Sequence, residues 1–236
     1  MSVCQFRGQQ PQAVTVPRTA LLVGASGLVG GRLLHVLLDD PAYERVMALV
    51  RRGLPVRHKK LVQREIAFDL LADLGNVPRA HVVFCCLGTT MKKAGSRAAF
   101  SRVDLDYVRE LARLASAAGA AQFLLVSALG ADPRSRVFYN RVKGEAEEAV
   151  KQTRFDGIHI FRPSLLVGNR PVPRPAERIV VGVARILAPI LVGALRKYRP
   201  IAAETVARAM VSVAHEARKG VHVYPSDRIQ TLGVQP

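Results

Sequence analysis

The sequence predicts an α/β protein in which helices cover both faces of a parallel sheet, with a small lobe added toward the C-terminus. Three observations predict this doubly wound class. Short apolar runs alternate with longer amphipathic segments from Thr19 onward, three glycines follow the first apolar run, and three prolines within 169–178 end the alternation. With 236 residues, 49% of them hydrophobic, the chain can bury a substantial core.

The expected strands are short and rich in β-branched or aromatic residues, and the expected helices lie between them. Strands are predicted at 19–24, 45–50, 60–66, 81–88, 122–128 and 157–163. Helices are predicted at 28–38, 97–118, 137–152, 176–196 and 202–217. Because no repeat or linker interrupts this order, residues 19–236 are expected to form one domain behind a flexible leader, 1–18. Residues after about 165 are expected to contribute the lobe that covers the ligand crevice.

The charge balance is strongly basic, with a formal net charge of +17. Such a field concentrates phosphorylated cofactors, nucleic acids or lipid surfaces without recognising any one of them. Nucleic acid is the weakest of these expectations because no aromatic-rich basic stripe accompanies the charge. The apolar segment 179–195 contains Arg185 and Pro189 near its centre, which favours a bent lobe helix. An interfacial helix making peripheral membrane contact is the alternative.

The cysteines and the first residues bear on the compartment. Cys4, Cys85 and Cys86 are an odd number with one adjacent pair, which fits neither a disulfide framework nor a zinc site, and no metal is expected. The first 18 residues lack the apolar stretch of a secretory signal, and no apolar run reaches the roughly 18 residues of a membrane-spanning helix. These features predict a globular protein of the cytoplasm.

A glycine-rich turn follows the first predicted strand and opens the first predicted helix. Gly24 permits a sharp turn, Gly27 lets the backbone approach a pyrophosphate, and Gly30 brings helix against strand. The N–H groups at the helix start then supply donors to the phosphates. This context favours a dinucleotide-binding loop over an ordinary flexible turn, and it also places three further residues at the cofactor: Ser26, Leu28 and Val29.

The end of the second predicted strand indicates which dinucleotide binds. An NAD site places a carboxylate there for the ribose 2′-hydroxyl, whereas this chain has Arg51 and Arg52. Guanidinium groups bind a 2′-phosphate through forked, charge-assisted hydrogen bonds. The expected cofactor is therefore NADP(H), with NAD(H) as the alternative, unless the two arginines form only a solvated turn.

A phenol and an ammonium lie one helical turn apart at Tyr139 and Lys143, and Ser127 ends the preceding strand. A free phenol has a pKa near 10, so it shuttles protons at neutral pH only beside a cation such as Lys143. Ser127 is expected to orient a substrate carbonyl while Tyr139 protonates its oxygen and Lys143 bonds the nicotinamide ribose. The alternative is a buried aromatic beside an ion pair between Lys143 and Glu147.

Three segments narrow the interpretation: CCLGTTMKKAGSRAAFSRVDLDYV, SALGADPRSRVFYNRVKGEAE and IFRPSLLVGNR, which begin at residues 85, 127 and 160. With the Gly-x-x-Gly-x-x-Gly spacing, they resemble the Tat-interacting-protein branch of atypical short-chain dehydrogenases with an NAD(P)-binding Rossmann fold. The resemblance runs from about residue 19 to 232 and covers nearly the whole chain.

The resemblance implies further cofactor contacts. It places Asp69 and Leu70 at the adenine, with Asp69 accepting from its amino group. Cys86 and Leu87 line the adenine-ribose side as packing residues, and Gly88 lets the backbone pass close to the cofactor. Two more residues lie beside the nicotinamide carboxamide: Pro163 and Leu166. The loop 130–138 borders the substrate crevice, and Asp104 takes the position where many members have an Asn that completes a proton relay.

The resemblance therefore implies an NADPH-dependent oxidoreductase that transfers hydride between the nicotinamide and a small carbonyl or alcohol substrate. The alternative is an NADP(H)-sensing regulatory or protein-binding module with little or no turnover. Either a monomer or a homodimer is expected, the latter through helices 97–118 and 137–152.

Overall fold

A computed structural model describes residues 18–71, 75, 77–168 and 193–234. Seven strands form a parallel sheet in the order β3-β2-β1-β4-β5-β6-β9. The strands are β1 (Arg18–Val23), β2 (Tyr43–Val50), β3 (Leu61–Glu65), β4 (Val82–Cys85), β5 (Gln122–Val126), β6 (Gly157–Arg162) and β9 (Gly220–Pro225). The predicted doubly wound class is confirmed. The order reverses between β1 and β4, the switch point where ligands bind in such sheets.

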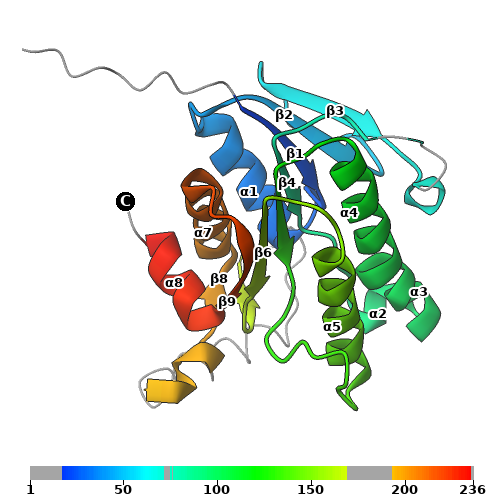
Figure 1. The fold of residues 1–236 in the computed structure, drawn as a ribbon, viewed down its shortest axis with the longest axis vertical. Helices are drawn as coiled ribbons and strands as arrows, with labels where there is room; N and C mark the ends of the chain where they lie inside the picture. Colours follow the sequence, from blue (N-terminus) through cyan, green and yellow to red (C-terminus); the bar gives the residue numbers. More distant parts are fainter. Residues whose placement is uncertain (1–17, 72–74, 76, 169–192, 235–236) are drawn as a thin grey trace, which may run out of the picture.

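Helices cover both faces of this sheet (Figure 1). One face carries α1 (Leu28–Asp39), α7 (Ala203–Glu216) and α8 (Ser226–Val234), and the other carries α4 (Tyr107–Ala117) and α5 (Phe138–Lys151). The strands alternate accordingly, because Ala20 and Leu22 pack in the first cluster while Leu21 and Val23 pack in the second. Strands buried on both faces explain why their sequences read as continuous apolar runs.

The predicted helix 97–118 consists of three pieces. It begins as α3 (Arg97–Ser101), widens into the π-helical turn η3 (Arg102–Asp106) and continues as α4. The shorter helix α2 (Met91–Ala94) precedes it, and a single 3₁₀ turn, η1 (Phe68–Leu70), follows β3. A π turn changes the facing of one residue relative to a regular helix, and here it places Asp104 in the protein interior.

The C-terminal region differs from a simple appended lobe. Residues of α7, β9 and α8 belong to the main layers, and β9 forms an edge of the sheet beside β6. The described part of the expected lobe comprises the short pair β7 (Leu166–Val167) and β8 (Ile201–Ala202) and the 3₁₀ segment η4 (Gly193–Tyr198). Residues 1–17 of the predicted leader and most of the predicted helix 176–196, with Arg185 and Pro189, lie outside the described residues, whereas Arg18 begins β1.

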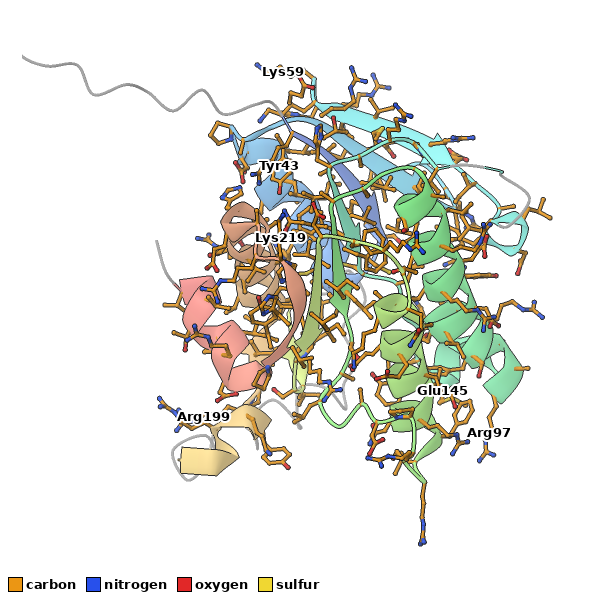
Figure 2. The ribbon with its side chains drawn as sticks, viewed as in Figure 1. Tyr43, Lys59, Arg97, Glu145, Arg199 and Lys219 are labelled. Carbon is orange, nitrogen blue, oxygen red and sulfur yellow. The ribbon has the colours of Figure 1, made fainter. Side chains whose placement is uncertain are left out.

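Charged side chains lie on well-separated parts of the surface. Lys59, Arg97 and Arg199 stand far apart in Figure 2, whereas Tyr43 is buried between the sheet and a helix. Within the described ranges, no helix is long and apolar enough to cross a bilayer. The described residues also contain no cluster of three potential metal ligands.

Candidate active site

The turn between β1 and α1 packs against the loop after β4 so closely that it requires glycine. Gly24 has φ +87°, and a Cβ there would lie 2.4 Å from the Cys86 carbonyl oxygen. A Cβ on Gly30 would lie 2.2 Å from the Gly24 carbonyl oxygen. Real Cβ atoms do not approach backbone this closely, so both glycines are needed to close the turn at the switch point.

The N-terminus of α1 is open to a ligand. Gly27 is its N-cap, no side chain caps the first turn, and no acidic residue lies in that turn. The Gly27 N–H donates to the Gly24 carbonyl over 2.9 Å. As at any helix start, the N–H groups of the first turn have no carbonyl partner within the helix. Ser26 is exposed beside them, Leu28 is half-buried and Val29 packs into the core. This cradle fits the phosphates of a dinucleotide.

Four of the residues predicted to contact the ribose and adenine end are exposed. Arg51 and Arg52 lie in the bend directly after β2. Asp69 on η1 accepts a hydrogen bond from the Tyr107 hydroxyl, and its Oδ1 lies 3.6 Å from an Arg102 nitrogen. Burial, reinforced by Asp69, raises the pKa of Tyr107 to about 12. The neighbouring Leu70 side chain projects into solvent.

The loop after β4 joins the cofactor cradle to the predicted catalytic helix. The Cys86 N–H donates to the Val23 carbonyl over 2.8 Å, and Leu87 packs against the core. Burial raises the pKa of Cys85 to about 12 and that of Cys86 well above its usual value, so both thiols remain protonated packing groups. A Cβ on Gly88 would lie 3.4 Å from Asp104 Oδ1 and 3.5 Å from Lys143 Nζ.

Tyr139 and Lys143 occupy neighbouring turns of α5. The Tyr139 ring lies 5.6 Å from the Phe100 ring, and the side chain stays 37% exposed. Lys143 Nζ lies 2.8 Å from Asp104 Oδ1 in the interior. Burial lowers the pKa of Lys143, but Asp104 and Tyr139 oppose it, and the net pKa is above its usual value. Lys143 therefore carries its charge, and Asp104 rather than Glu147 is its ion-pair partner.

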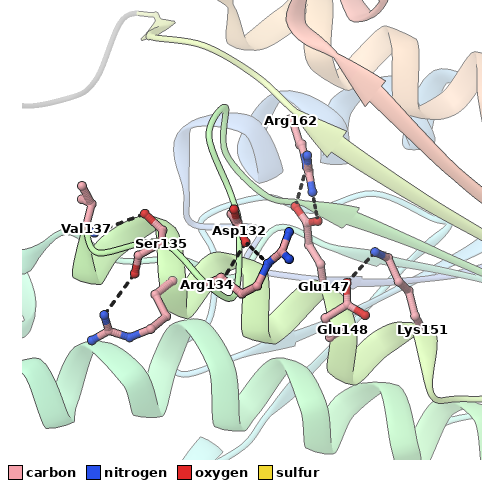
Figure 3. Close-up of polar contacts among 9 residues, drawn as sticks. Asp132, Arg134, Ser135, Val137, Glu147, Glu148, Lys151 and Arg162 are labelled. Carbon is pink, nitrogen blue, oxygen red and sulfur yellow. Dashed lines mark hydrogen bonds and ion pairs between the residues drawn. The ribbon is translucent and has the colours of Figure 1, made fainter.

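Ser127 and Glu147 belong to a second buried network. The Ser127 hydroxyl donates to Glu147 Oε1 over 2.5 Å. Arg162 donates to both Glu147 oxygens, over 2.9 Å from Nε and 2.5 Å from a terminal nitrogen. Figure 3 shows Arg162 reaching from the end of β6 to Glu147 on α5. The Ser127 proton thus points to a carboxylate instead of being free for a substrate.

The loop between β5 and α5 is fixed onto that helix. Its own turns are closed by Asp132, which accepts from the Arg134 N–H, and by Ser135, whose hydroxyl accepts from the Val137 N–H (Figure 3). A Cβ on Gly144 of α5 would lie 2.2 Å from the Pro133 nitrogen. The loop therefore packs directly against the helix backbone.

A cavity of about 630 Å³ opens where this loop, the end of β6 and η4 meet. Its walls combine two cationic side chains, an amide, an aromatic ring and apolar or backbone surface. They are formed by Leu129, Gly130, Asn140, Arg162, Lys197, Tyr198, Val223 and Pro225. Nearby, the Pro163 carbonyl accepts from the Leu129 N–H over 2.9 Å, and Leu166 pairs with Ile201 in the small sheet.

Comparison with known proteins places the chain in a family. Residues 20–225 match the NAD dependent epimerase/dehydratase family. The chain belongs to this family. Within it, the Tat-interacting-protein branch of atypical short-chain dehydrogenases, expected from the sequence, is confirmed by its relatives.

Relatives at 32–38% identity support this assignment. The rat protein HTATIP2 is 38% identical over 68% of this chain and 67% of its own length. The mitochondrial protein fmp52 of Emericella nidulans is 35% identical, covering 75% of each chain, and that of Aspergillus clavatus is 32% identical, covering 89% and 93%.

Among solved structures, MoeE5 in complex with UDP-glucose and NAD has a TM-score of 0.65 at 19% identity, covering 88% of this chain and 75% of MoeE5. The dTDP-4-dehydrorhamnose reductase of Bacillus anthracis in complex with NADP has a TM-score of 0.61 at 15% identity, covering 89% and 75%. At these identities the likeness establishes the fold. Together with the NAD dependent family, the glycine cradle supports a nicotinamide dinucleotide as cofactor.

The expected cytoplasmic location is wrong. The fmp52 relatives from Emericella nidulans and Aspergillus clavatus are named as mitochondrial proteins. The reasoning failed because unpaired cysteines indicate a reducing environment without identifying the compartment. The absence of a secretory apolar stretch likewise excludes only one kind of targeting segment.

The structure brings some predicted residues together and separates others. Gly24 meets Cys86 at the switch point, and Gly88 lies over Lys143. Ser127 is turned toward Glu147 instead. Sequence reasoning missed the contribution of one pair of residues, Glu147 and Arg162. Two signals could have identified this pair: an arginine ending an apolar strand, and a glutamate on the helical face of Tyr139 and Lys143.

Proposed function

We propose that the protein is an NADPH-dependent oxidoreductase acting on a small carbonyl or alcohol substrate. The observation that carries this proposal is the arrangement of Tyr139 and Lys143 on one face of α5. The charged Lys143 lies beneath the Gly88 backbone, and the Tyr139 side chain remains partly accessible. A phenol next to a held ammonium is suited to proton transfer with a carbonyl oxygen.

The cofactor seat is proposed to run from η1 to β7. The open α1 N-terminus with Gly24, Gly27 and Gly30 binds the pyrophosphate, and Arg51 and Arg52 bind a ribose 2′-phosphate. Asp69 would bind the adenine, and the nicotinamide end would lie near Pro163 and Leu166. When bound, the nicotinamide supplies or accepts the hydride.

Each side chain of the proposed site has a separate role in proton transfer or binding. Tyr139 would donate its proton to the substrate oxygen, and Lys143 would hold the nicotinamide ribose and support the charge that develops on the phenol. Ser127 would act indirectly, because its hydroxyl anchors Glu147 and thereby joins β5 to α5. The proposed substrate crevice is the 630 Å³ cavity, where Lys197 favours a substrate bearing an anionic group, because Arg162 is already paired with Glu147.

Direct binding and turnover measurements test this proposal. Fluorescence titration should show tighter binding of NADPH than of NADH. With a panel of small carbonyl compounds, Tyr139→Phe should abolish NADPH oxidation and leave NADPH affinity within about twofold, because the phenol acts on the substrate. NADPH oxidation that persists in Tyr139→Phe would remove Tyr139 from the mechanism.

A second candidate function is an NADP(H)-sensing regulatory or protein-binding module with little or no turnover. The observation that favours it is the Ser127 hydroxyl, which is directed at Glu147 instead of the crevice. If NADPH binds, no carbonyl in the panel is reduced, and bound NADPH changes the affinity for a partner protein, this second function replaces the first. In either case we propose a monomer or a homodimer through α4 and α5, which analytical ultracentrifugation distinguishes.

A further inference from the structure

Asp104 brings a buried carboxylate into the candidate site, directly beside Lys143. Its side chain has no solvent exposure. Oδ1 lies 2.8 Å from Lys143 Nζ, and Oδ2 accepts the Thr89 N–H over 2.8 Å. The carboxylate thus binds both the ammonium of the catalytic helix and the backbone of the loop that carries Gly88.

The π turn is what brings this carboxylate to Lys143. Asp104 is the buried residue of η3, whereas Asp106, two positions later in the same turn, pairs with Arg109 at the surface. A regular helix would have presented a different residue to α5. The widened turn therefore delivers one carboxylate to the interior and leaves the other in solvent.

Among the groups that face Lys143 in the described part of the chain, Asp104 is the one that carries a negative charge. From the end of β4 and the residue after it come the Cys85 and Cys86 thiols, which burial keeps protonated. From α5 comes Tyr139, one turn away, and from η3 comes Asp104 itself. Since two buried opposite charges in contact cancel at short range, the field that Lys143 exerts on the Tyr139 phenol is much weaker than that of a lone ammonium.

We propose that Asp104 is a positioning residue that fixes Lys143 beneath Gly88 and partly offsets its charge, so that the Tyr139 phenol loses its proton less readily than it would beside Lys143 alone. This inference rests on the proposed function, because a protonated phenol serves carbonyl reduction, whereas alcohol oxidation requires the phenolate. The site is thereby biased toward donating a proton to a carbonyl substrate.

The test measures Tyr139 ionisation without cofactor or substrate. The ultraviolet absorbance of tyrosinate is followed with pH, and subtracting the same titration of Tyr139→Phe isolates this one phenol. Asp104→Asn keeps the size of the side chain and an oxygen for the Thr89 N–H but removes the charge. The Asp104→Asn titration is corrected in the same way, by subtracting that of the double variant Asp104→Asn/Tyr139→Phe. The midpoint of Tyr139 ionisation should then lie about one pH unit or more below the wild-type midpoint.

Asp106→Asn is the matched control. It removes a carboxylate from the same turn, but one whose partner is the exposed Arg109. The Tyr139 titration should therefore stay within about 0.2 units of the wild type. If Asp104→Asn does not fold, Asp104→Ser removes the same charge with a smaller side chain and is expected to give the same downward shift.

Two results would overturn the proposal. One is an unchanged Tyr139 titration in the folded Asp104 variant. The other is an upward shift, which would mean that Lys143 gives up its proton in place of Tyr139. A separate NADPH titration of the wild-type protein keeps the two ideas apart, because failure to bind NADPH contradicts the proposed function while leaving the tyrosine titration interpretable.

Discussion

The two halves of the sheet build their parts of the site in different ways. Around β1 and β2, the cradle consists of backbone, and glycines are needed because neighbouring carbonyl oxygens occupy the space of a side chain. Around β5 and β6, the site consists of buried charged groups that bind one another across secondary structure elements. The comparison teaches that the turn after β1 tolerates no side chain at Gly24 or Gly30, whereas the buried pairs tolerate no unmatched charge.

The largest expected effect on stability concerns the glycine turn after β1. Gly30→Ala places a Cβ against the Gly24 carbonyl, where neither backbone can yield, and should lower the free energy of unfolding by about 3 kcal/mol or more. Gly31→Ala is the control in the same helix, because its Cβ would meet only the Ala25 oxygen at 3.4 Å. It should be neutral or stabilise by about 0.5 kcal/mol. Urea unfolding of the pair measures both, and equal losses would contradict the backbone argument.

The next effect concerns the charged half. Glu147→Gln leaves the Arg162 guanidinium with a neutral partner and should destabilise the protein by about 2.5 kcal/mol. Glu148→Gln, the adjacent position, removes only the exposed pair with Lys151 and should cost less than about 0.5 kcal/mol. Thermal unfolding of the two variants separates them. A Glu147 variant as stable as the Glu148 variant would show that the buried network contributes little.

A third prediction concerns His159, a buried residue of β6 that lies opposite His222 of the edge strand β9. Burial, with His222 and Arg218 nearby, lowers the pKa of His159 to about 4. Between about pH 6.5 and 4 the unfolded chain binds a proton at this position that the folded protein does not. Stability should therefore fall by about 3 kcal/mol as pH falls through this window, at about 1.4 kcal/mol per unit of pKa shift, and level off for this group below it. In His159→Gln the loss of stability over this pH range should be smaller. Urea unfolding at a series of pH values measures it, and the same pH dependence in wild type and variant would show that His159 is not responsible.

The smallest effect is on cofactor choice. Replacing Arg51 and Arg52 together by Ala should weaken NADPH binding about tenfold, or about 1.4 kcal/mol, and leave NADH binding unchanged. The double replacement of Arg57 and Arg64 by Ala removes the same charge from nearby positions and should affect the two coenzymes equally. Equal losses for both coenzymes in the Arg51/Arg52 variant would mean that those arginines act only through the general field.

The same division explains what could be predicted from the sequence. The strands and the glycine turn were predictable because each depends on residues adjacent in the chain, and the confirmed fold class follows from their alternation with helices. The edge strand β9 was missed because its sequence, GVHVYP, has only two aliphatic residues, and a Gly, a His, a Tyr and a Pro interrupt the apolar pattern. Its pairing with β6 decides its conformation instead.

The buried ion pairs could not be predicted for a different reason. Lys143 has Glu147 one turn away on its own helix, and local spacing favours that pair. The choice of Asp104 depends on the π turn, and the choice of Arg162 by Glu147 depends on where β6 ends beside α5. Such preferences arise from three-dimensional packing between elements, which a single sequence does not encode locally.

The close packing of the β5–α5 loop on Gly144 limits which changes in the proposed substrate crevice the protein can accept. Since the Pro133 nitrogen occupies the space of its missing side chain, the loop and the helix behind it form one rigid wall. Transplanting a longer or differently shaped loop from a relative will succeed only if the donor also has a glycine at the matching helical position. New substrate preferences are therefore acquired most easily at the exposed tip, around Arg134 and Arg136, where substitutions leave that wall intact.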